Sequence, residues 1–168
     1  MKYIGYFTSL DNKKYSVEIT SSGSGEAAIT FSGTPCIIEW TGEEENIFKP
    51  IKYSSATFEY ISDQLYLDLY AAKPLQNVVR LKDDTGKVVW QGYVTPNVYD
   101  NTFDFALTIK SIECIDGLAI LEYVDYSTIG GGAKKVVNVY DIIKHCLGKT
   151  NLTYNYLYIS DNVKVDNT

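Results

Sequence analysis

The chain of 168 residues contains only three cysteines and one histidine, the side chains on which disulfide scaffolds and many metal sites depend. It also lacks the long hydrophobic run of a membrane-spanning helix. Cys36, Cys114 and Cys146 are odd in number and widely spaced, which argues against a disulfide framework and against a zinc site. No apolar stretch is long enough to cross a membrane. The short apolar run at the start breaks at Thr8, unlike a secretory signal. We therefore expect buried free thiols in a reducing cytoplasm, no metal and no membrane span.

Basic side chains are also scarce. The chain contains 15 Lys and Arg and 21 Asp and Glu, so its net charge is -6 and its pI is near 4.7. Affinity for nucleic acid comes from cationic side chains that displace condensed counterions. The longest basic cluster, Lys134 with Lys135, is too small for this and is interpreted as a solvated loop. Nucleic acid is therefore not an expected partner.

The composition favours strands. Fifteen tyrosines and a hydrophobic content of 45% accompany a single methionine, and aromatic side chains pack well on a pleated surface. The length allows one core, or one core with the start of a second small domain. We therefore predict a mainly β (α+β) fold, an antiparallel β-barrel or sandwich-like domain, followed by a short helical segment that begins a second domain.

Several segments alternate with the two-residue period of a half-buried strand. Between Thr102 and Cys114 this period slips by one residue, and a β-bulge near Lys110 or Ser111 would explain the slip. The expected core-facing sets are Tyr15, Val17 and Ile19; Ala56, Phe58 and Tyr60; and Phe103, Phe105, Leu107 and Ile109, continued by Ile112 and Cys114.

Turn-forming residues separate these runs. Residues 21–25 read as a flexible loop and residues 32–35 as a tight turn, and residues 43–45 are interpreted as an exposed acidic loop. Residues 83–86 form the firmest signal, because the arms on either side, residues 78–81 and 87–90, are both β-prone. A hairpin is therefore predicted there.

Two helical segments are expected after Cys114. Asp116 can cap a short helical turn over residues 116–122. After the Gly-rich link at residues 130–132, Asn138 can cap a longer helix, and Gly148 is its expected left-handed C-terminal stop. We predict a barrel-like domain over residues 1–126 and the start of a second α+β domain over residues 127–168.

Signals for catalysis are weak. Gly148-Lys149-Thr150 ends like a phosphate-binding loop, but its predicted helix precedes the glycine instead of following it. His145 and Cys146 are neighbours on that helix and do not face each other. Asp104 with Glu113 or Asp116 would serve glycoside hydrolysis only if the fold brought them together. We therefore expect no enzyme, and assign no catalytic, cofactor-binding or metal-binding residue.

The many tyrosines leave a binding role open. Tyr154, Tyr156 and Tyr158 alternate on one side of a predicted strand. Rigid amphipathic rings suit both a sugar-binding platform and a protein interface. A carbohydrate- or receptor-binding β-sandwich module is therefore one hypothesis for this chain.

The order of the elements carries a family resemblance. The segments at residues 53–58, 88–94 and 112–121, followed by 139–143 and 151–154, resemble in order the N-terminal part of phage tail hub proteins. These are the central baseplate proteins of phages, with relatives among distal tail proteins and the hubs of contractile secretion systems. The residues of this chain that match the pattern are Trp90, Gly92, Val94, Asp116, Leu121, Asp141 and Ile142.

The resemblance implies a structural, non-enzymatic role, and the alternative is a carbohydrate- or receptor-binding β-sandwich module of a tail tip or cell surface. A hub-like protein has a barrel-like domain, associates with itself into a ring, and joins the tail tube to the spike or tip. It also implies a location in the virion tail, after assembly in the bacterial host cytoplasm. Hub proteins are usually much longer than this chain, which leaves open a fragment or a smaller relative.

Overall fold

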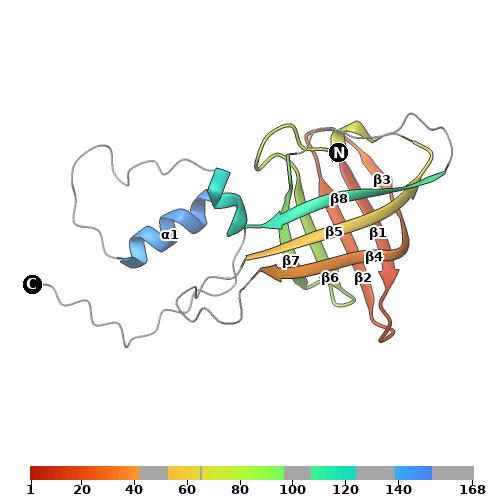
Figure 1. Ribbon diagram of the computed structural model, residues 1–168, viewed down its shortest axis with the longest axis horizontal. Helices are drawn as coiled ribbons and strands as arrows, with labels where there is room; N and C mark the ends of the chain where they lie inside the picture. The colour runs from red at the N-terminus through yellow and green to blue at the C-terminus, as the bar shows by residue number, and fades with distance from the viewer. Residues whose placement is uncertain (42–52, 65, 97–106, 124–138, 153–168) are drawn as a thin grey trace, which may run out of the picture.

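In the computed structural model (Figure 1), residues 1–41, 53–64, 66–96, 107–123 and 139–152 are described. The predicted mainly β fold is confirmed, although one strand pair, β1 with β3, is parallel and makes the sheet mixed. Eight strands form one sheet in the order β3-β1-β2-β6-β7-β8-β5-β4. Their bounds are β1 Lys2–Thr8, β2 Lys14–Thr20, β3 Glu26–Ala28, β4 Thr30–Thr41, β5 Tyr53–Ser62, β6 Val78–Asp83, β7 Val88–Val94 and β8 Thr108–Asp116.

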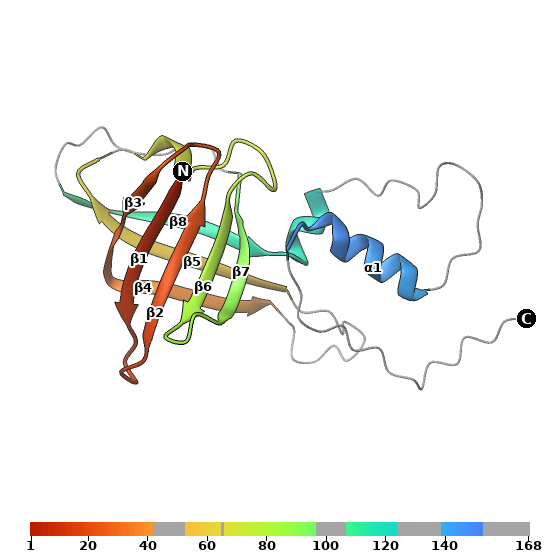
Figure 2. The same ribbon diagram turned by 180° about the vertical axis from the view of Figure 1, so that it is seen from behind.

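The sheet curls until its two ends meet. Its terminal strands β3 and β4 are consecutive in the chain, joined only through Ile29. The Ile29 N–H donates to the Ile4 carbonyl across a distance of 2.9 Å, so the chain enters β4 while still bonded to β1. Gly5 permits this approach, since a Cβ there would lie 2.3 Å from the Phe31 ring. Figures 1 and 2 show the result, two crossing layers with β4, β5 and β8 over β1, β2, β6 and β7.

The core lies between these layers. Tyr15 is half-buried and packs against the core, while the other members of the first two predicted sets are buried. Fully enclosing such side chains is the main source of folding free energy, each contributing about 1.5–3 kcal/mol. The buried core residues are Tyr3, Val17, Ile19, Ile29, Ala56, Phe58, Tyr60, Leu69, Ala71, Val79, Leu81, Trp90, Val94, Ile112 and Cys114.

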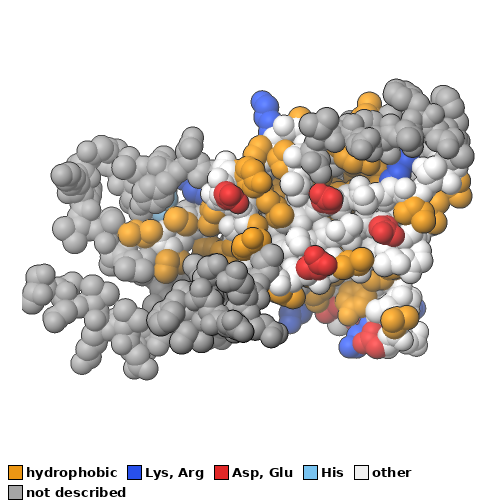
Figure 3. Space-filling view, in the orientation of Figure 1, with side chains coloured by type: hydrophobic (Ala, Val, Ile, Leu, Met, Phe, Trp, Pro, Cys, Tyr) orange, Lys and Arg blue, Asp and Glu red, His pale blue; other side chains and the backbone are white. Residues whose placement is uncertain are grey.

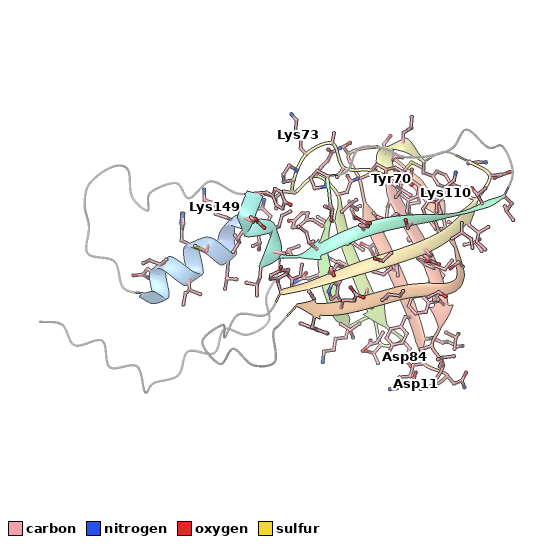
Figure 4. The ribbon with its side chains drawn as sticks, viewed as in Figure 1. Asp11, Tyr70, Lys73, Asp84, Lys110 and Lys149 are labelled. Carbon is pink, nitrogen blue, oxygen red and sulfur yellow. The ribbon has the colours of Figure 1, made fainter. Side chains whose placement is uncertain are left out.

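The bulge predicted near Lys110 or Ser111 is wrong. β5 and β8 pair without a register shift, from Ser55 opposite Ile115 to Ser62 opposite Thr108. Lys110, the third residue of β8, points inward and lies near Tyr70 (Figure 4). Its ammonium group donates to the Gln64 carbonyl at 2.8 Å.

A lysine can bury its stem while its charged end reaches polar atoms at a sheet rim. Ile109 and Leu107 consequently face outward, 64% and 70% exposed, and the prediction that they face the core is also wrong. Phe103 and Phe105 lie outside the described residues.

Two other irregularities do occur. The register of β4 shifts against β5 between Phe31 and Cys36. The tight turn predicted at residues 32–35 is therefore wrong, because these residues form an irregular stretch within β4. Ser32 supports this stretch by donating to Glu59 at 2.9 Å and accepting from the Thr34 N–H at 3.1 Å. A second shift lies in the β6–β7 pair, beside Leu81.

The hairpin predicted at residues 83–86 is confirmed. Gly86 has a φ of 82°, and its N–H donates to the Asp83 carbonyl at 3.0 Å. The Asp83 carboxylate accepts from the Thr85 and Lys87 N–H groups, a pattern that stabilises a tight turn. The loop predicted at residues 21–25 is likewise found between β2 and β3.

Three short helices complete the described chain: η1 (Leu67–Leu69), η2 (Ala119–Tyr123) and α1 (Val139–Lys149). Gly148 lies inside α1, so the predicted left-handed stop at Gly148 is wrong. Asn151, with a φ of 52°, takes the left-handed conformation instead, because short amide side chains tolerate it. Asn138, residues 43–45 and the glycines at 130–132 lie outside the described residues, and the domain boundary at 126 stays a prediction.

Candidate functional site

A partly buried hydrogen-bond network joins three strands at one end of the sheet. The Trp90 indole N–H on β7 donates to Ser54 Oγ on β5 at 3.0 Å. The Ser54 hydroxyl and N–H both donate to Asp116 Oδ2 at the end of β8, at 2.9 and 2.6 Å. Because Trp90 is 6% and Ser54 1% exposed, neither has water as an alternative partner. Two of the residues matched to the hub pattern, Trp90 and Asp116, are thereby brought together.

The second Asp116 oxygen fixes the turn that follows. Oδ1 accepts from the Leu118 and Ala119 N–H groups at 3.0 and 2.9 Å, as an N-capping carboxylate does. The predicted capping role of Asp116 is therefore confirmed, although the capped element is the 3₁₀ helix η2. The Asp116 carboxylate thus holds the end of β8 against β5 and also fixes the turn through which the chain leaves the sheet.

Gly92 allows β7 and β8 to lie close together, where they pair opposite Asp116. A Cβ at position 92 would lie 2.2 Å from the Ile115 carbonyl and 2.6 Å from the Trp90 ring. Glycine is therefore required where β7 meets β8. Val94 follows on β7 and is buried at 2% exposure. Four of the seven matched residues, Trp90, Gly92, Val94 and Asp116, thus have structural roles at this junction or beside it.

The other three matched residues lie elsewhere. Leu121 is half-buried on η2, and its N–H donates to the Leu118 carbonyl at 3.2 Å. Asp141 is exposed and Ile142 half-buried, both early in α1. These three support helical segments and do not line a common site with Asp116.

A second cluster attaches the end of α1 to the outer side of the sheet. Tyr93, Ile120 and Leu152 are buried together, with Leu75, Val78 and Ile115 packed against them. The Tyr93 hydroxyl donates to the Thr150 carbonyl. Sequence reasoning missed this contact, because alternation alone does not reveal that an outward tyrosine is covered by a later segment.

A polar network occupies the end of the sheet near η1. The Asp68 carboxylate accepts from the Tyr3 hydroxyl and from the Ser21 hydroxyl, the latter at 2.7 Å. Burial alone would raise the pKa of Asp68, but these hydrogen bonds outweigh it and lower that pKa. Asn77, fully buried, donates to the Asp68 and Leu69 carbonyls at 2.8 and 2.9 Å. This arrangement fastens the chain around η1 to β1.

The residues weighed for catalysis that the structure describes lie in different parts of the fold. Asp116 is engaged in the strand junction, Glu113 faces outward on β8, and Asp104 lies outside the described residues. His145 and Cys146 are half-buried neighbours on α1. Within the described residues, no three metal-ligating side chains cluster together.

The cysteines are unbridged. Burial raises the pKa of Cys36 to about 11 and raises that of Cys114 strongly, which keeps both as neutral thiols near neutral pH. Cys114 is buried, whereas Cys36 and Cys146 are half-buried. The predicted free thiols are present, though only one is fully enclosed. None of the helices in the described part of the chain has the length and apolar character to cross a membrane.

Comparison with protein-family models, curated proteins and solved structures finds no match to this chain. The hub resemblance therefore depends on the motif residues of the sequence alone. Tyr154, Tyr156 and Tyr158, the tyrosines singled out for binding, lie outside the described residues.

Proposed function

We propose that this chain is a structural component of a phage or prophage tail, a hub-like module that joins the tail tube to the tip. The supporting observation is the junction of Trp90, Ser54 and Asp116, because two residues matched to the hub pattern, Trp90 and Asp116, are joined there through Ser54 in one partly buried network. A module of this kind transmits load and needs rigid strand junctions. It does not need a reactive cleft.

The proposal also concerns the binding partners of the chain and its location. The chain would associate with tube, spike or tip proteins and with further copies of itself in the virion tail, after assembly in the bacterial host cytoplasm. Exposed large hydrophobic side chains on the sheet are available for such contacts. On the described sheet they include Tyr6, Ile37, Trp40, Val89 and Ile109.

Co-expression tests this proposal. The chain is produced together with the tube and tip proteins encoded beside it, and the mixture is separated by size exclusion with light scattering. We expect a complex that contains the chain in a fixed ratio. Folded chain that elutes apart from every tail protein would contradict the proposal, as would a gene neighbourhood without tail genes.

A carbohydrate-binding role is the second candidate. One observation favours it: Tyr6, 75% exposed, borders an open hollow that Ile4, Glu26, Ala27 and Ala28 also line. An exposed ring beside a carboxylate can stack on a sugar and accept its hydroxyl groups. Glycan-array binding that is lost in Tyr6→Ala and kept in Tyr123→Ala, another exposed tyrosine, would support this role over the structural one.

A further inference from the structure

One outer face of the sheet is acidic. Side chains alternate along β4, β5 and β8, and those that do not point to the core form a face toward solvent. Among the described residues, the charged side chains of this face are all carboxylates: Glu39, Glu59 and Glu113. Figure 3 shows acidic side chains spread over these three strands. We call this the acidic face.

The opposite face is basic. It is formed by β1, β2, β6 and β7, which lie in front in Figure 2, together with β3 beside β1. Glu18 lies at its centre, 3.1 Å from Lys2, 2.8 Å from Lys82 and 3.9 Å from Arg80. A single carboxylate does not neutralise three cations. The charged side chains of this basic face are Lys2, Lys14, Arg80 and Lys82 against Glu18 and Glu26.

The cations are held in place. Burial alone would raise the pKa of Glu18, but hydrogen bonds from Lys82 and Lys2 outweigh it and lower that pKa, so Glu18 stays ionised at neutral pH. Its ionic contacts orient the lysine ends on the strand surface, and the lysine side chains remain 36% and 27% exposed. The positive excess is therefore a fixed feature of this face in a chain whose net charge is -6.

Each face also presents apolar side chains. Ile37 and Ile109 are 43% and 64% exposed on the acidic face, and Tyr6 and Val89 are 75% and 49% exposed on the basic face. Opposite charges guide encounter and orientation, while apolar contact provides most of the affinity. Each face therefore carries both components of an interface.

We propose that copies of this chain associate head to tail, with the acidic face of one copy against the basic face of the next. The inference rests on the proposed function, because it names the surfaces through which the self-association would take place. Two different faces that meet make a heterologous contact, which closes into a ring or extends into a filament according to the rotation between copies. A second copy is the favoured occupant because both charge signs are on the same molecule.

Salt dependence of the unmodified full chain is the first test. Sedimentation velocity is measured across a concentration series at about 0.02 M and about 0.5 M sodium chloride, since exposed charges are screened over shorter distances at higher salt. We expect association at low salt, and an apparent dissociation constant at least about tenfold higher at high salt. A monomer at every concentration in low salt would overturn the proposal, and so would association that salt does not weaken.

Charge reversal is the second test. One variant carries Glu39→Lys with Glu113→Lys, the other Lys14→Glu with Arg80→Glu, and the matched control is Lys73→Glu, an exposed loop lysine outside both faces. Neither variant should associate alone, because its two faces then carry the same sign. An equal mixture should associate again, because acidic and basic faces are both present.

Two outcomes of the second test overturn the proposal: persistent association in both variants, and no recovery on mixing folded variants, with folding checked by circular dichroism. If a variant does not fold, the salt series decides. A chain that binds tail tube protein yet stays monomeric refutes this inference alone. A chain that associates with itself but ignores all tail proteins refutes the proposed function alone.

Discussion

The carboxylate of Asp116 is the most consequential single group at the strand junction. It accepts four hydrogen bonds, two from Ser54 and two from the backbone of the following turn. Hydrogen bonds to a charged group contribute about 1.5–3 kcal/mol each, and a buried donor that loses its partner is costly. We therefore expect Asp116 to contribute more to the free energy of unfolding than most single residues of this fold.

Replacing Asp116 with alanine should destabilise the fold by about 2–4 kcal/mol. Urea unfolding, followed by tryptophan fluorescence because Trp90 belongs to the network, measures the loss. Ser111→Ala, at an exposed position of the same strand, is the control and should stay within about 0.5 kcal/mol. Equal midpoints for the two variants would show that the junction does not support the fold.

Two glycines are expected to respond in opposite ways to alanine. Gly92→Ala places a Cβ against the Ile115 carbonyl and should cost more than about 2 kcal/mol. Gly148 lies inside α1 with nothing within 4 Å of an added Cβ, so Gly148→Ala should be neutral or stabilise by up to about 1 kcal/mol. Thermal unfolding of both variants tests the pair, and a tolerated Gly92→Ala would contradict the close strand approach.

Asp68 should contribute to the pH dependence of stability. Its folded pKa is lowered, so its stabilising contribution is present above the unfolded pKa of about 3.9 and is lost as pH falls through the lower folded value. Urea midpoints measured from neutral to strongly acidic pH should fall less steeply below about pH 4 in Asp68→Asn than in the unmodified chain. Identical slopes would mean that Asp68 titrates alike in the folded and unfolded chain.

At the scale of elements, the sequence predicted the strands better than their irregularities. The alternation of Val17 with Ile19 and of Phe58 with Tyr60 identified core faces correctly, because burial on one face imposes that period. The hairpin at Asp83 followed from local turn chemistry. These features depend on neighbouring residues alone, so a single sequence reveals them.

Features that depend on distant partners were missed or misplaced. Lys110 interrupts an apolar pattern, and only the carbonyl of Gln64 at the rim explains why a lysine points inward there. The stretch at residues 32–35 looks like a turn but stays in β4, because β5 continues to pair on both sides of it. Ser54, essential to the junction, carries no sequence signal of its own.

The contact of Tyr93 with Thr150 should hold α1 against the sheet. Tyr93→Phe removes the hydroxyl that donates to the Thr150 carbonyl while leaving the ring in its cluster. Hydrogen exchange of residues 139–152 should become faster, while exchange in β1 and β2 stays unchanged. Tyr123→Phe, at an exposed position on η2, should leave both regions as they were. Unchanged exchange in Tyr93→Phe would show that packing alone attaches the helix.

At the scale of the whole molecule, the sheet closes through the continuous β3–β4 segment. Strand β3 occupies the edge of β1 along residues 2–4, so this part of β1 is already paired within the chain. Contacts between copies would instead use the outer faces, where charge and exposed apolar side chains lie.

Quantitative mass spectrometry of tail particles, purified from the strain that encodes this chain, tests the structural role most directly. The account predicts that peptides of the chain remain with the tails through gradient purification, in a fixed ratio to the tube protein. A chain that is abundant in the lysate but absent from intact tails would contradict it.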